Sequence, residues 1–215
     1  MCPYNPRAVT RKLICTLERG LVFTHEAVRE WEAQLAPFLS ETLRKHRRGR
    51  IGPSWYTDET YIKVKGRWTY LYRAIDRDGN LVDVLLSETR DKAAAEAFFR
   101  SARTVTGRVP ERVTTDGHDA YPGAIKAQLG KGVRHRTTRY LNNHLEQDHR
   151  GIKQRIRPMG GFKSVESARR FCRVHDEVRN FLRPRSRRNE VVSLAQRRIR
   201  YTARTRVLLT SLAAA

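Results

Sequence analysis

The sequence is poor in cysteine and has no long apolar run. Its 215 residues include only three cysteines, Cys2, Cys15 and Cys172, with no Cys-x-x-Cys spacing. Thiols scattered in this way predict a reducing compartment and exclude a disulfide framework. No apolar stretch approaches the length of a membrane span, and the first residues do not form a signal peptide. We therefore expect a cytoplasmic protein with no membrane partner.

Acidic residues are also scarce, and this shortage leaves a large positive charge. Lys and Arg total 44 and Asp and Glu total 22, so the formal net charge is +22. A surplus of this size predicts a polyanionic partner, most simply nucleic acid. The alternatives at this point are a very soluble basic protein and an RNA binder of the ribosomal type.

The chain divides into three predicted parts at two basic, proline-containing linkers. Residues 1–52 form a short helical module that ends in a basic linker, and 53–183 form the main domain. Residues 184–215 form a basic C-terminal tail that includes an amphipathic segment around residues 191–209. Proline, glycine and clustered charge mark such boundaries.

The first part has the outline of a helix-turn-helix. A short helix is predicted over residues 7–19, and a second from His25 to about Lys45 with Thr24 as its N-cap. Pro37 is expected to kink or split the second helix. A plain helical hairpin is an equally good interpretation.

The main domain begins with strands and continues with alternating helices and strands. The hydrophobic pattern predicts a mixed α/β sheet flanked by helices, as in the ribonuclease H-like fold. The predicted strands cover 55–65, 68–75, 81–88, 112–115 and 133–138, and the helices cover 92–106, 121–129, 143–157 and 165–182.

Asp58 occupies an unusual place in the first of these strands. Alternation puts it on the same face as Tyr56, Thr60, Ile62 and Val64, which is predicted to be the apolar face. An ionised carboxylate among apolar side chains is costly unless it is paired or binds a metal. A strand-end aspartate that reaches water or an arginine is the alternative.

Two further acids complete a possible metal site. Asp116 ends the fourth strand, and Glu146 lies early in a helix with His149 and Lys153 on the same face. Three carboxylates from two strands and a helix could hold two hard divalent cations for phosphoryl transfer. Taken singly, Asp116 could be a turn residue and Glu146 part of a capping box.

These segments resemble the transposases of insertion sequences of the IS-six type. The similarity covers about residues 53–182: residues 55–76 resemble the first-acid segment, 115–117 the second, and 142–164 the third. The resemblance implies an Asp-Asp-Glu (DDE) transposase with a ribonuclease H-like core, two Mg²⁺ ions (with Mn²⁺ as a substitute) and no small-molecule cofactor. It implies DNA, both transposon ends and target, as substrate. It also implies Asp58, Asp116 and Glu146 as catalytic residues and metal ligands.

The resemblance and the charge pattern together predict the DNA contacts. Lys153 falls where the family has a basic residue near the cut. The full set of expected DNA-binding residues is Lys153, Arg150, Arg155, Arg157, Lys163, Arg44, Lys45, Arg47 and Arg48. A homo-oligomer is expected, because joining two ends generally needs at least two subunits.

Two departures from the family pattern affect what we expect. The interval between Asp116 and Glu146 is somewhat short, and the segment before Leu17 matches poorly. We therefore expect intact chemistry with weak recognition of element ends. A metal-dependent nuclease or resolvase of the same fold is one alternative, and a catalytically inactive DNA-binding remnant is another. The aromatics Trp68, Tyr70 and Tyr72 are interpreted as core and cross-strand pairs rather than as base-stacking surfaces.

Overall fold

The computed structural model describes residues 24–138, 143–183 and 192–213. The predicted helix over residues 7–19 and the basic linker at 184–191 lie outside them. The elements in chain order are α2 His25–Arg47, β1 Ser54–Val64, β2 Arg67–Asp76, β3 Leu81–Ser87, α3 Lys92–Thr106, β4 Arg112–Thr115, α4 Ala120–Gln128, β5 Arg134–Thr137, α5 Asn143–Ile156, η1 Arg157–Met159, α6 Val165–Leu182 and α7 Leu194–Ala213.

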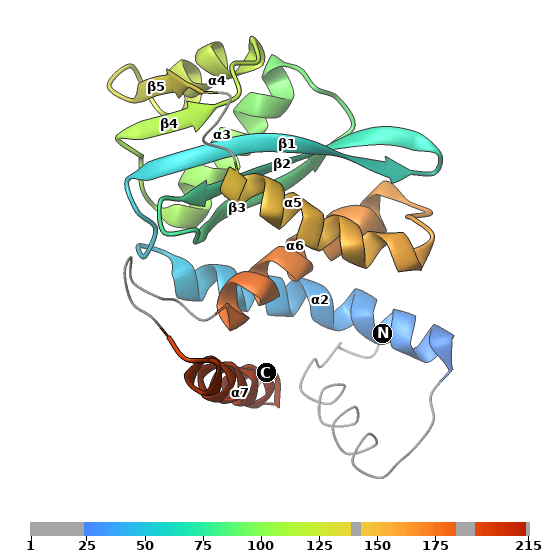
Figure 1. The fold of residues 1–215 in the computed structure, drawn as a ribbon. Helices are drawn as coiled ribbons and strands as arrows, with labels where there is room; N and C mark the ends of the chain where they lie inside the picture. The colour runs from blue at the N-terminus through green and yellow to red at the C-terminus, as the bar shows by residue number, and fades with distance from the viewer. Residues whose placement is uncertain (1–23, 139–142, 184–191, 214–215) are drawn as a thin grey trace, which may run out of the picture.

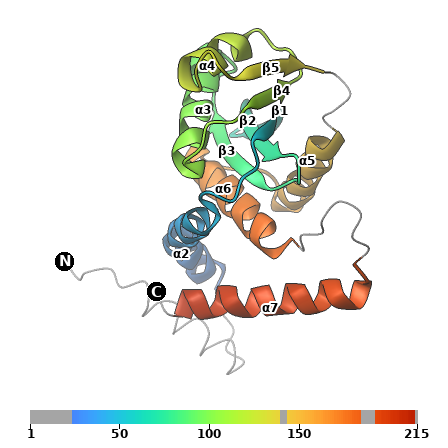
Figure 2. The ribbon, with the colours of Figure 1, turned by 90° about the vertical axis from the view of Figure 1, so that its left-hand side faces the viewer.

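The five strands form one mixed sheet with the order β3-β2-β1-β4-β5. β1 pairs antiparallel with β2, and β2 with β3, whereas β4 runs parallel to both β1 and β5. Helices lie on both sides of the sheet (Figures 1 and 2). This arrangement confirms the predicted ribonuclease H-like α/β fold.

Two hydrophobic clusters fill the spaces on either side of the sheet. Trp55, Phe98 and Tyr121 belong to the cluster beneath α3 and α4. Ile62 and Ile152 belong to the cluster beneath α5 and α6. The sheet is therefore covered on both faces, as parallel strands require.

Helices cover both faces of the sheet, so β1 differs from the prediction of a single apolar face. The face of Ile62 and Val64 is buried as predicted, but the other face is buried too, at Trp55, Thr57 and Glu59. Trp55 is fully buried and donates its indole N–H to the Gly52 carbonyl at 3.1 Å. A central strand in a three-layer domain has no solvent face over this length.

Local signals fix the helix ends. The side chains of Thr24, Asp91 and Ser164 each accept a hydrogen bond from a backbone N–H in the first turn of α2, α3 and α6. α2 continues through Pro37 without being split. The β1–β2 turn is Lys65-Gly66, both with positive φ.

α2 is attached to the core through a buried arginine. Arg47 makes a two-pronged ion pair with Glu177 at 2.7 and 2.8 Å and also donates to the carbonyls of Leu81 and Val82. Arg44 contacts Asp83 at 3.2 Å. Both guanidinium groups are therefore paired with acids of the domain, and Arg47 is buried, so this arrangement lends no support to the prediction that they bind DNA.

α7 lies beyond α2 and α6, away from the sheet (Figure 2). Arg204 donates to the carbonyl of Phe181 at 3.1 Å, and Leu208 is buried, but most of the helix surface is exposed. Among the described helices, none is long and apolar enough to cross a membrane.

Candidate active site

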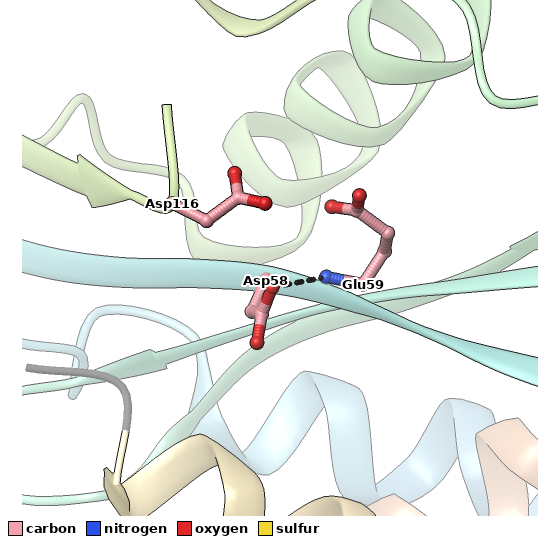
Figure 3. A group of neighbouring side chains, drawn as sticks. All are labelled: Asp58, Glu59 and Asp116. Atoms are coloured by element: carbon pink, nitrogen blue, oxygen red, sulfur yellow. Dashed lines mark hydrogen bonds between the residues drawn. The ribbon is translucent and has the colours of Figure 1, made fainter. Parts of the chain in front are cut away.

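Strand register brings Asp58 and Asp116 together. Thr114 of β4 lies opposite Tyr56 of β1 in a parallel pair. Two residues further along each strand, Asp58 and Asp116 are therefore level with each other. Figure 3 shows both carboxyl groups at this point of the sheet. The structure thus brings together two of the three predicted acids.

Asp116 is held by a tight turn after β4. The backbone N–H of His118 donates to Asp116 Oδ1 at 3.1 Å. Gly117 has φ +96°, and a Cβ there would lie 2.5 Å from the methyl carbon of Thr137. Only glycine fits this position, so the Asp-Gly pair orients the carboxylate as well as turning the chain.

Glu59 is a third acid at this site, and the sequence analysis did not select it. Its carboxylate, that of Asp58 and that of Asp116 each offer an oxygen, and these oxygens all lie within 4.8 Å of one another. Glu59 is also the acceptor of a hydrogen bond from the hydroxyl of Tyr121 and of an ion pair from Arg90. Two partners of Glu59 thus come from α4 and from the loop before α3.

Arg90 links Glu59 to Asp116. Its guanidinium lies 3.5 Å from Asp116 Oδ2 while it pairs with Glu59. Burial lowers the pKa of Arg90, but the charge of Glu59 and its hydrogen bond outweigh this and raise it. Arg90 therefore stays charged and balances one of the three carboxylates.

The remaining negative charge lies on Asp58 and Asp116, which are both half-buried. Burial, followed by the charges of Glu59 and Asp116, raises the pKa of Asp58 to about 7. The Glu59 backbone N–H, 3.0 Å from Asp58 Oδ1, and the charge of Arg90 oppose this rise only in part. Carboxylates that resist joint ionisation in this way fit a divalent cation, which would supply the missing positive charge.

Glu146 lies in the first half of α5, and its side chain is outside the described residues. Its neighbours Leu145 and His149 are buried, and α5 packs on β1 and β2. In Figure 3, Asp58 points toward the side of the sheet on which α5 begins. The backbone therefore puts Glu146 on the helix that faces Asp58.

The other predicted DNA-binding residues are exposed. This holds for Arg150, Lys153, Arg155, Arg157 and Lys163 of the α5–α6 region and for Lys45 and Arg48 at the end of α2. Two further aspartates of the domain lie away from this site. Asp76 accepts bonds from Gly52, Asp78 and Asn80 in its turn, and Asp119 is exposed at the start of α4.

Similarity to known proteins covers the same part of the chain. The family described as "DDE domain" matches residues 52–185. The transposase for insertion sequence-like element IS431mec of Staphylococcus aureus (strain Mu50 / ATCC 700699) is 42% identical over 143 residues, which are 64% of this chain and 62% of that protein. The transposase for insertion sequence element IS257 in transposon Tn4003 of S. aureus is 42% identical over 142 residues, with the same shares. The chain thus spans less than two thirds of the length of these relatives.

Among solved structures, the HTLV-2 integrase catalytic core domain in complex with magnesium (trimeric form) aligns with 72% of this chain and 99% of its own. The TM-score is 0.46 and the identity 14%. A similarity of this size carries no inference about activity. The family match covers well over half of the chain and includes both strand acids and α5. The chain therefore belongs to the DDE domain family, and its resemblance to insertion-sequence transposases of the IS-six type is confirmed.

Proposed function

We propose that this protein is a DNA transposase that cleaves the ends of an insertion sequence and joins them to target DNA. The observation that carries the proposal is the meeting of Asp58 and Asp116 on adjacent strands, within a chain of the DDE domain family. Relatives of this chain are named as transposases of insertion sequences. We place the reaction in the cytoplasm of a prokaryotic cell.

Asp58 and Asp116, with Glu146 as the third ligand, would hold two divalent cations. Mg²⁺ is the natural choice for oxygen ligands and Mn²⁺ a substitute. When bound, such ions supply charge stabilisation and alignment for an in-line displacement at phosphorus. The carboxylate set fits this role because it carries more negative charge than Arg90 alone balances.

The protein's own residues prepare the site for this charge. Asp58 has to be ionised to act as a ligand, and its raised pKa means that a cation displaces a proton over the neutral range. Arg90 and Tyr121 hold Glu59, so this carboxylate is a structural partner rather than a third ligand. The division leaves Asp58 and Asp116 for the cations.

Exposed cations around α5 would hold the DNA. Lys153 and Arg157 lie on the C-terminal half of α5 and at its end, on the same side of the sheet as Asp58. Both can neutralise phosphates without leaving a buried acid unpaired. A homo-oligomer on DNA would bring two ends together.

The decisive experiment is a strand-transfer assay with a pre-cut element end, supercoiled target DNA and Mn²⁺. A transposase joins the end to the target, whereas a nuclease or resolvase of this fold only hydrolyses. The Asp58→Asn variant is the control for metal-dependent catalysis. Cleavage without joining would favour the nuclease, and an equal lack of reaction in wild type and Asp58→Asn would favour a DNA-binding remnant.

A further inference from the structure

Beyond the acids, the outer half of β1 has an edge without a strand partner. β1 pairs with β4 only through Ser54, Trp55 and Tyr56. From Thr57 to Lys63 this edge has no strand partner among the described residues, and an isolated bridge from Val64 to Phe162 ends it. The open edge therefore starts beside Asp58 and runs along β1 toward the β1–β2 turn.

A groove of about 700 Å³ is lined by this half of β1 together with residues of β2 and of the end of α5. Tyr61, Trp68 and Tyr70 form its aromatic wall, and Ile62 and Ile156 contribute apolar surface from β1 and α5. Trp68 is 61% exposed and Tyr61 is 45% exposed. Apart from Tyr201 of α7, the other aromatic rings among the described residues are buried or half-buried, so two neighbouring rings with this much free surface form a distinct exposed apolar patch.

The aromatic wall is an ordered cross-strand arrangement. Tyr61 meets Trp68 edge to face with ring centroids 6.3 Å apart, and it packs against Tyr70 at 5.3 Å. The expected cross-strand pairs are therefore present, and Tyr72 belongs to the core. The pairing, however, leaves Tyr61 and Trp68 at the surface, where their rings can be contacted from outside.

The rim of the groove is cationic. Lys63, Lys153 and Arg157 line it, and none of the described acidic side chains does. The Lys63 ammonium lies 5.6 Å from the centre of the Trp68 ring. Aromatic faces beside positive charges bind single-stranded nucleic acid, because bases stack on the rings while phosphates meet the cations. A duplex keeps its base faces covered and cannot use such a wall.

We propose that this groove binds unpaired nucleotides of the DNA strand next to the cut, stacked on Trp68 and Tyr61. Asp58 and Tyr61 are three residues apart on one strand, which is about 10 Å. That is roughly the length of three stacked bases, so a strand held at the acids reaches the groove within a few nucleotides. The inference rests on the proposed function for its position beside the cut.

The test measures binding of a fluorescein-labelled 12-nucleotide oligothymidylate by anisotropy, in EDTA so that no cleavage occurs. Trp68→Ala should weaken binding by roughly 5- to 150-fold, the range that loss of one base–aromatic stack produces. Tyr61→Ala should weaken it in the same direction. Trp68→Phe keeps an aromatic ring and should stay near wild type. Binding of a duplex of the same length should change little.

A second measurement locates the stacked bases. A duplex end with three unpaired nucleotides, one of them 2-aminopurine, should lose fluorescence on binding to wild type and keep it with Trp68→Ala. Thermal unfolding of each variant checks that the fold is intact, as expected for an exposed side chain. Equal oligothymidylate affinities for wild type and Trp68→Ala would overturn the proposal, and so would an equal loss on duplex.

Two other outcomes distinguish nucleotide binding in the groove from a subunit interface and from the proposed transposase activity. If Trp68→Ala changes the oligomeric state in sedimentation but not oligonucleotide binding, the groove is a subunit interface and the proposal fails. If wild type shows the stacking signal but neither cleaves nor joins DNA in Mn²⁺, the groove stands and the proposed transposase activity falls.

Discussion

At the scale of single residues, Glu59 and Asp58 are neighbours with opposite surroundings. Glu59 is 9% exposed and has Arg90 and Tyr121 as partners. Asp58 has one backbone N–H and the repulsion of two acids. Glu59 is therefore paired within the protein, whereas Asp58 is the carboxylate that we propose for the cation.

We predict that Mn²⁺ stabilises the wild type and Glu59→Gln against thermal unfolding, but not Asp58→Asn. A ligand that binds only the folded state raises its stability in proportion to the logarithm of its concentration. Glu59→Gln should lower the metal-free stability by about 1–3 kcal/mol, because Arg90 loses its charged partner. Loss of the Mn²⁺ effect in Glu59→Gln would make Glu59 a ligand.

Arg47 allows a second prediction at this scale. Arg47→Ala leaves Glu177 and two carbonyls buried without their donor, and should cost about 3–5 kcal/mol of unfolding free energy. Its neighbour Arg48 is exposed, and Arg48→Ala should change stability by no more than about 0.5 kcal/mol. Urea denaturation measures both, and similar values for the two variants would contradict a structural role for Arg47.

At the scale of elements, α5 joins the site to the core through a buried histidine. His149 is 7% exposed, and its Nε2 has no hydrogen-bond partner in the described part of the chain. Burial first, and then the charges of Arg73 and Lys153, lower the pKa of His149 to about 4, while Asp176 opposes them. The imidazole is therefore neutral in the folded protein at neutral pH.

This shift predicts a loss of stability in acid. Between pH 6.5 and about 4 the unfolded chain binds a proton at His149 that the folded chain does not, so the free energy of unfolding falls as the pH falls. The full effect is roughly 3 kcal/mol. His149→Gln should remove this part of the pH dependence, and the exposed His46→Gln should not. Urea titrations at several pH values measure the free energy of unfolding of each variant. If the pKa shift were absent, this free energy would depend on pH in the same way in the wild type and in His149→Gln.

Elements were predictable from sequence where their signals are local. The start of α6 at Val165 follows from the Ser164 cap, and that of α3 from Asp91. The pairing of Arg47 with Glu177 joins residues 130 positions apart, and Tyr121 reaches Glu59 over 62. No periodicity encodes such partners, so the burial of Arg47 and the role of Glu59 needed the packed structure.

At the scale of the whole molecule, the buried acids help to explain why the net charge of +22 lies at the protein surface. Asp83, Asp176 and Glu177 are all buried beside arginines. These pairs cancel inside the domain, and they also remove acidic groups from the surface. The surplus of Lys and Arg is therefore a surface property, which is where a DNA backbone can meet it.

The surface charge predicts a steep salt dependence of duplex binding, and we expect Lys153 to be one of the contributing cations. Each phosphate contact adds about −0.9 to the slope of log K against log salt. Lys153→Gln, beside the open edge of β1, should make the slope less steep by about 0.9. Lys126→Gln is the matched control, because this exposed lysine lies on α4, which covers the opposite face of the sheet.

Anisotropy titrations from low to physiological salt measure both slopes. An unchanged slope for Lys153→Gln, or an equal change for Lys126→Gln, would mean that DNA does not lie along α5, because a diffuse attraction to the whole surface would not distinguish the two lysines.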